Sequence, residues 1–277
     1  MPALDRVRET GGVKVHVVSD IHGNAEALAR AGEGADALLV LGDLIDFVDY
    51  QDHGNGILGA LFGADKVATF ARLRREGTRD ETVAYSRSLW ASLEDPAAAV
   101  DEAIREQYAT LFGALSAPTY ATPGNVDTPA LWPEYAARSS EGVRVLDGEV
   151  TEIGGLRFGF VGGALLPEGV TPRRGAVWRP YLRTPEDYDA AVAGLSGIDV
   201  LCTHIPPAIA DLTYDVVARR AEFGSAALLA LIEKEQPRYS LFGHVHQPLS
   251  ARRRWGRTEC RNVGHFKETE RSYVLRW

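Results

Sequence analysis

Carboxylate and imidazole side chains follow two apolar segments near the start of the chain. Asp20 and His22 come directly after residues 13–18, a run rich in β-branched residues that is typical of a buried strand. Asp43 follows a second such run, 35–41, and a helix-forming stretch separates the two. This strand–helix–strand order predicts parallel strands, whose carboxyl ends meet at one edge of a sheet. At that edge, one carboxylate or imidazole from each loop can help to hold a metal ion.

Three later loops place further metal-binding side chains after expected strands. Asn125, His204, and the pair His244 and His246 each follow a short apolar run. A mixture of imidazole, carboxylate and amide oxygen is typical of sites for Mn²⁺, Fe or Zn²⁺, whereas structural zinc sites are rich in cysteine. An isolated Asp-x-His pair arises often by chance, so the prediction depends on the recurrence of such side chains at five strand ends.

The five blocks occur in an order that resembles the calcineurin-like metallophosphoesterase superfamily. They are Asp-x-His, Gly-Asp, Gly-Asn-x-Asp, a single His after a strand, and Gly-His-x-His, and they span residues 15–246. The resemblance implies a binuclear centre of two divalent metal ions, Mn, Fe or Zn. It assigns Asp20, His22 and His246 to one ion, Asn125, His204 and His244 to the other, and Asp43 to the bridge between them.

The resemblance also implies an α/β fold, a four-layer α-β-β-α sandwich of two mixed sheets flanked by helices. No linker or low-complexity tract interrupts the 277 residues, so we expect a single domain, 1–277. Helical patterns fill residues 64–115, which we expect to be a helical insertion, either a cap or a partner surface for a homo-oligomer. Extra helices packed on the same core are the simpler interpretation. Residues 143–161 alternate as two or three antiparallel strands, with Gly154 and Gly155 as a hairpin turn.

The activity implied by the resemblance is hydrolysis of a small phosphodiester or a nucleotide-like phosphate by attack of a metal-bridging hydroxide. Two divalent ions lower the pKa of the water between them and neutralise charge that builds on the phosphoryl oxygens. Asp43, Asn125 and His204 then belong to the catalytic clamp on metal and phosphate. No nucleophilic side chain is required.

Val126 departs from the family pattern, in which a His at this position lies near the leaving group and acts as a general acid. The departure favours a phosphodiesterase over a monoesterase and places the proton donor in doubt. His53, in a loop rich in Gly and Asp, is a weak candidate acid, although a solvated histidine is the simpler interpretation. Arg173 and Arg174 are weak candidates for binding substrate phosphate, although a solvated surface is the simpler interpretation.

Two other functions stay open at this point. A non-catalytic scaffold can keep the same fold for binding partners, as a retromer subunit does by resemblance, and the missing His and the helical segment fit that interpretation. Against it, all seven expected ligand positions carry competent residues. A protein phosphatase shares such a metal site, but serine and threonine are poor leaving groups and need a general acid more.

Composition limits the partners and the location of the protein. The net charge of −8 argues against a nucleic-acid binder and suits a small phosphate ester neutralised by metal ions. No apolar run approaches the roughly 18–20 residues of a membrane span, and residues 1–12 lack the apolar core of a signal peptide. Cys202 and Cys260 form no disulfide framework. We therefore expect a cytoplasmic protein without a membrane partner.

Overall fold

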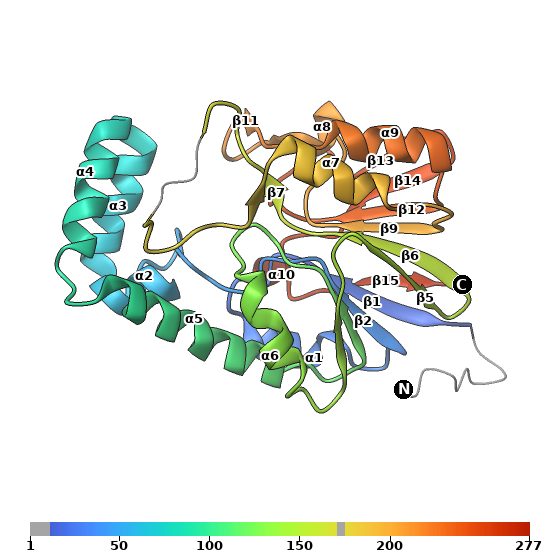
Figure 1. Ribbon diagram of the computed structural model, residues 1–277, viewed down its shortest axis with the longest axis horizontal. Coiled ribbons are helices and arrows are strands. Elements are labelled where there is room, and N and C mark those ends of the chain that lie inside the picture. Colours follow the sequence, from blue (N-terminus) through green and yellow to red (C-terminus); the bar gives the residue numbers. More distant parts are fainter. Residues whose placement is uncertain (1–11, 171–174) are drawn as a thin grey trace.

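Two mixed β-sheets pack face to face, and helices cover both outer faces (Figure 1). The structure is a computed structural model that describes residues 12–170 and 175–277. It has the four-layer α-β-β-α sandwich that the resemblance implies. The strand ends of the two sheets carry the predicted site.

The first sheet has five strands in the order β15-β1-β2-β3-β4. Four of them run parallel, and β15 is antiparallel to β1 at one edge. Their bounds are Lys14–Val18 (β1), Ala37–Val40 (β2), Thr119–Ala121 (β3), Val143–Val145 (β4) and Tyr273–Arg276 (β15).

The second sheet has six strands in the order β13-β14-β12-β9-β6-β5. The four central strands run parallel, and β13 and β5 are antiparallel edge strands. Their bounds are Glu149–Ile153 (β5), Leu156–Val161 (β6), Val200–Thr203 (β9), Tyr239–Phe242 (β12), Arg252–Trp255 (β13) and Thr258–Asn262 (β14). Two short ribbons complete the strands: Ala164–Leu165 (β7) with Leu182–Arg183 (β8), and Tyr214–Asp215 (β10) with Arg220–Ala221 (β11).

The predicted strands of residues 143–161 divide between the two sheets. Strands β5 and β6 form the expected hairpin, and its turn residues Gly154 and Gly155 have φ values of 53° and 82°, as a two-residue turn requires. Strand β4, however, pairs parallel with β3 in the first sheet. The expectation of a third antiparallel strand is therefore wrong, because alternation along a strand does not reveal which distant strand it pairs with.

The core between the sheets is built from alternate residues of the parallel strands. In β1, Val15 and Val17 point into the space between the sheets, where they meet Phe158 and Phe160 of β6. All four side chains are fully buried. Val18 instead packs against the helices on the outer face. Because both faces of the first sheet are covered, its central strands read as continuous apolar runs.

Helices from separate parts of the chain form the two outer layers. The helices on the first sheet are Ala25–Ala31 (α1), Pro96–Gly113 (α5) and Trp132–Ala136 (α6), which follows the 3₁₀ turn Pro129–Leu131. Those on the second sheet are Pro185–Ala193 (α7), Ala210–Thr213 (α8) and Ala226–Glu235 (α9). A short helix, Phe266–Thr269 (α10), precedes β15.

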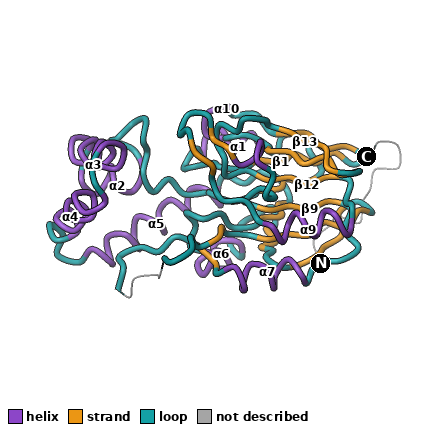
Figure 2. Tube along the Cα trace, turned by 90° about the horizontal axis from the view of Figure 1, so that it is seen from above, coloured by secondary structure: helices purple, strands orange, loops and turns teal. Residues whose placement is uncertain are grey.

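Four helices lie between β2 and β3, in and just before the predicted segment 64–115. They are Gly56–Phe62 (α2), Ala64–Glu76 (α3), Arg79–Trp90 (α4) and α5. Asp95 caps α5 by accepting from Ala98 N, and Tyr108 and Phe112 of that helix are buried in the core. Helices α3 and α4 project away from the sheets at one end of the molecule in both views (Figures 1 and 2). Whether this segment forms a homo-oligomer interface stays a prediction.

The described residues include no helix that is both long enough and apolar enough to cross a bilayer. The two cysteines, Cys202 and Cys260, are free and buried. Cys202 faces the core between the sheets, and Cys260 packs on the outer side of the second sheet.

We predict that Phe158→Ala destabilises the protein by about 3–5 kcal/mol, because it opens a cavity where the two sheets meet. Urea denaturation followed by circular dichroism measures the change. Val217→Ala serves as the control, since Val217 is 75% exposed, and we expect a change within about 0.5 kcal/mol. Equal midpoints for the two variants would contradict the assignment of Phe158 to the core.

Candidate metal centre

The eight parallel strands of the two sheets end at one edge of the sandwich, which we call the site edge. The loops that build the site follow six of these strands, β1, β2 and β3 of the first sheet and β9, β12 and β14 of the second. The loops after the first five carry all seven predicted metal ligands. The structure brings these side chains together in two groups that share Asp43.

The first group lies where the loops after β1, β2 and β12 meet. Asp20, His22 and Asp43 each offer a ligand atom within 4.8 Å of the other two. His246 joins them, because its Nε2 lies 3.2 Å from His22 Nε2 and 3.3 Å from Asp20 Oδ1. All four side chains therefore point at one small volume.

The second group lies between the first and second sheets. Asp43, His204 and His244 form another set with mutual distances below 4.8 Å. His204 Nε2 is 3.4 Å from Asp43 Oδ2 and 3.0 Å from Asn125 Oδ1. Asp43 thus faces both groups, the position that a bridging carboxylate needs.

Four of the predicted ligands at the site edge have an unusual backbone conformation. Asp20, His22, Asp43 and His244 all have positive φ, between 41° and 67°. Residues with a Cβ rarely adopt this left-handed conformation, which costs about 1–3 kcal/mol at each position. Such strain is typical of positions where the surrounding fold aims a side chain for function.

Two glycines of the sequence blocks allow the loops to approach closely. A Cβ on Gly124 would lie 2.3 Å from Asp43 N, and a Cβ on Gly243 would lie 2.2 Å from Asp20 Oδ2. Any larger residue would push the carboxylates out of place. The glycines of Gly-Asn and Gly-His are therefore needed for packing between loops.

Asp127, the last residue of the Gly-Asn-x-Asp block, holds two of these loops together from behind. It is fully buried and accepts hydrogen bonds from Leu44 N, Gly124 N and the Tyr108 hydroxyl, at 3.1, 2.8 and 3.2 Å. Burial and repulsion by Asp43 raise the pKa of its carboxyl to about 7. Asp127 thus joins the loops after β2 and β3 to helix α5.

Opposite charges balance the two buried carboxylates that face the site. Burial alone would raise the pKa of Asp20, but the hydrogen bond and charge of His246 hold it well below its usual value. Burial is likewise outweighed at Asp43, where His204 lowers the pKa to about 2. Burial would lower the pKa of His204, but Asp43 raises it to about 9. A metal ion would take over the charge that these histidines supply, and its binding would release their protons.

The donor set fits a metal centre. Neighbouring ligands of one ion lie about 3.0–3.4 Å apart when the metal–ligand bonds are about 2.1 Å, and the separations of 3.0–3.4 Å given above match. His244 Nε2 is buried without a hydrogen-bond partner among the described residues. Burial and the charge of His204 lower the His244 pKa to about 4, which leaves the imidazole neutral and able to bind a metal.

His265 also lies at the site, although its place was not predicted. Its ring stacks on His246 with a centroid separation of 3.9 Å and meets the edge of His22 at 5.6 Å. Burial, followed by the charge of His246, lowers its pKa to about 3. The signal was available, because His265 follows β14 just as the other ligands follow their strands.

The weaker candidates of the sequence analysis are not brought to the centre. His53 lies in the turn before α2 and belongs to none of the His and Asp groups formed by the described residues. Arg173 and Arg174 fall outside the described residues. Val126 lies at the loop tip beside Asp43, whose Oδ1 accepts from Val126 N at 2.9 Å. Val126 thus lies beside the shared carboxylate without offering a proton.

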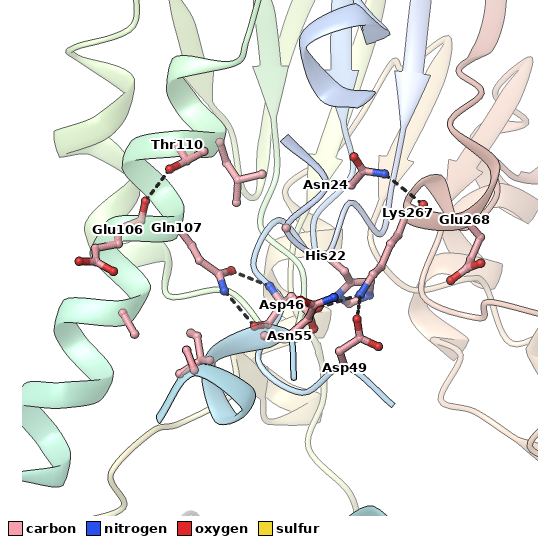
Figure 3. A pocket seen from close by; sticks show the side chains of 16 residues that line it. His22, Asn24, Asp46, Asp49, Asn55, Glu106, Gln107, Thr110, Lys267 and Glu268 are labelled. Carbon is pink, nitrogen blue, oxygen red and sulfur yellow. Dashed lines mark hydrogen bonds and ion pairs between the residues drawn. The ribbon is translucent and has the colours of Figure 1, made fainter. Parts of the chain in front are cut away.

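A cavity of about 620 Å³ opens beside the first group (Figure 3). Its wall includes His22 and residues of α2, α5 and α10. Lys267 Nζ is 2.7 Å from both Asp46 Oδ2 and Asp49 Oδ2, while Glu106 and Glu268 add negative charge. The charged groups of the lining are therefore mostly acidic, and one of the predicted metal ligands, His22, forms part of the wall.

Comparisons with known proteins agree with this architecture. The chain is similar in structure to TT1561 of Thermus thermophilus, with a TM-score of 0.55 and 16% sequence identity over 96% of this chain and 99% of that chain. At this identity the likeness shows a shared fold. No curated protein sequence matches the chain significantly. The family model described as calcineurin-like phosphoesterase matches residues 13–248. The chain therefore belongs to the calcineurin-like phosphoesterase family, whose members are metal-dependent hydrolases of phosphoesters.

Proposed function

We propose that the protein is a phosphodiesterase with a binuclear metal centre, acting on a small phosphodiester or a nucleotide-like phosphate. The observation that carries this proposal is the convergence of five loops on two ligand groups that share one carboxylate. The residues proposed to hold the two divalent ions, Mn, Fe or Zn, are Asp20, His22, Asp43, Asn125, His204, His244 and His246.

The side chains are oriented for metal binding by the backbone behind them. His204 Nδ1 lies 2.8 Å from Leu41 O, and His22 Nδ1 lies 3.2 Å from Ile45 O. Donation from Nδ1 to these carbonyls leaves the Nε2 lone pair of each neutral ring facing the site. When bound, the ions supply a nucleophile from water near neutral pH and neutralise charge on the phosphoryl oxygens.

The cavity beside His22 is the place we propose for the organic part of the substrate. It adjoins the first ligand group and is closed on one side by α2 and α5. Gln107 of α5 accepts from Asp46 N at 2.8 Å and donates to Asp46 O at 3.1 Å, which ties the helical segment to the loop after β2. The helical segment would then help to select the substrate.

Val126 favours a diester with a good leaving group. Val126 has no proton to give to a poor leaving group, and the histidines beside Asp43 are the ones proposed to hold the metal ions. The same reasoning weighs against a protein phosphatase. A scaffold function leaves the buried carboxylates and the positive φ values at the site unexplained. A cytoplasmic location remains a prediction that rests on the two free cysteines.

The proposal is tested by measuring metal content together with hydrolysis of bis(p-nitrophenyl) phosphate. We expect about two metal ions per chain and turnover that chelation removes and Mn²⁺ restores. Bound metal without turnover of any diester would favour the scaffold. A protein that takes up no metal after add-back would refute the proposal.

We predict that Asp43→Asn lowers hydrolysis by more than about 100-fold, since even residues that only support metal ligands contribute about 10–100-fold. The amide loses the charge that holds both groups, so metal content should fall as well. Asp36→Asn is the control, because Asp36 lies at the start of β2, at the opposite end of the sheet. Wild-type turnover by Asp43→Asn would count against the shared carboxylate.

Chelation is expected to lower the thermal unfolding midpoint. An ion at 100 times its Kd stabilises the folded state by about 2.7 kcal/mol, which corresponds to about 5–10 °C in a chain of this size. Differential scanning calorimetry with and without chelator measures the shift. Asp43→Asn should show a smaller shift than the wild type, and an equal shift would place the bound metal elsewhere.

We predict that Val126→His raises the rate of hydrolysis of esters with poor leaving groups by about 10–100-fold, because it introduces a general acid. The rate on esters with good leaving groups should rise less. Rates for alkyl and p-nitrophenyl phosphodiesters measure the difference. Val126→Gln is the control, because glutamine is similar in size to histidine but cannot protonate the leaving group at neutral pH. Equal gains on both substrates would refute the explanation based on the leaving group.

A further inference from the structure

The loop after strand β14 also lies at the site edge, next to the five loops that carry the predicted ligands. This strand runs parallel to β12, and both end at the same level, with Phe242 opposite Asn262. The Asn262 side chain then donates to Val245 O at 2.8 Å, in the middle of the Gly-His-x-His block. His265 lies three residues further along, in a loop that the five sequence blocks do not include.

The loop is also fixed to the first sheet. Phe266 N and Lys267 N donate to the backbone oxygens of Ser19 and Asp20, both at 3.0 Å. His265 directly precedes these two residues, so its backbone is held against the loop that carries Asp20 and His22. His265 therefore lies in a loop that is fixed to the site edge and not in a free surface turn.

The His265 ring lies among the nitrogens of that group. One ligand nitrogen from each of His22, His246 and His265 lies within 4.8 Å of the other two. The His265 ring is nearly parallel to that of His246, at 14°, and nearly perpendicular to that of His22, at 83°. His265 Nε2 is buried and has no hydrogen-bond partner among the described residues. A buried nitrogen without a partner needs an explanation, and a metal ion held with His22 and His246 would provide one.

We propose that His265 is a further ligand of the metal ion assigned to Asp20, His22 and His246, an inference that rests on the proposed binuclear centre. The three nitrogens already lie within 4.8 Å of one another, so the side chains would have to converge further to hold one ion. The His265 ring must tilt out of its stack, since bound nitrogens converge on the ion.

A third imidazole makes the two metal positions chemically different. The first position then has three nitrogens and the carboxylates of Asp20 and Asp43, whereas the second keeps the amide oxygen of Asn125. Imidazole suits Zn, Fe and Co better than Mg or Ca. The first position is therefore the one that discriminates most strongly against hard cations.

The test is titration of the metal-free protein with Co²⁺, followed by calorimetry and by the visible spectrum of the bound ion. In His265→Phe the ring that stacks on His246 remains, but the nitrogen is lost. We expect one of two Co²⁺ affinities to fall about tenfold or more, with a change in its absorption band, while the other affinity stays the same. His53→Phe makes the same exchange at a histidine outside the three groups and should leave both Co²⁺ affinities unchanged.

The other outcomes separate this inference from the proposed function. Wild-type Co²⁺ affinities and spectrum in His265→Phe would overturn the inference alone and leave His265 as a residue that only stacks. Equal weakening of both sites would also overturn it, because a ligand acts on its own ion. Failure of the wild-type protein to bind Co²⁺ would overturn the binuclear centre itself.

Discussion

The burial of like-charged carboxylates at the site edge is the constraint on which the rest of the site depends. Asp20, Asp43 and Asp127 are at most 3% exposed, and a buried charge without partners is strongly destabilising. The chain compensates in different ways: histidines face Asp20 and Asp43, while two backbone N–H groups and a tyrosine hydroxyl face Asp127. In front of the site the compensation depends on the charge of His204 and His246, whose pKa values the carboxylates raise, and metal cations would take over that charge.

This arrangement requires a rigid support, because the loops that carry the ligands are strained. Four of the predicted ligands have left-handed backbones, and Gly124 and Gly243 leave no room for a Cβ between neighbouring loops. Strain of about 1–3 kcal/mol at each such position persists only where the surroundings offset it. The parallel ladders and the apolar layer between the sheets offset it here. The sandwich thus positions the metal ligands by fixing where the parallel strands that precede them end.

Much of the site could be predicted because metal ligands that follow parallel strands must meet at one edge. That rule needs only local sequence, and it applies equally to His265, which was missed because no known sequence block contains it. The pairing of Val143–Val145 with β3 could not be predicted, since alternation is local and pairing is not. Nor could the contact of Lys267 with Asp46 and Asp49, which joins residues more than 200 positions apart.

The electrostatics of the whole chain make the metal centre essential for recognising a phosphate ester. The net charge is −8, and the cavity beside His22 contains more carboxylates than amines, with Lys267 already paired to Asp46 and Asp49. An anionic ester would be repelled by this surface alone. Bound divalent ions are the largest local charges in such a site and reverse the sign of the field close to them. Metal binding would therefore precede substrate binding, and the acidic cavity would select against esters that carry further negative charge.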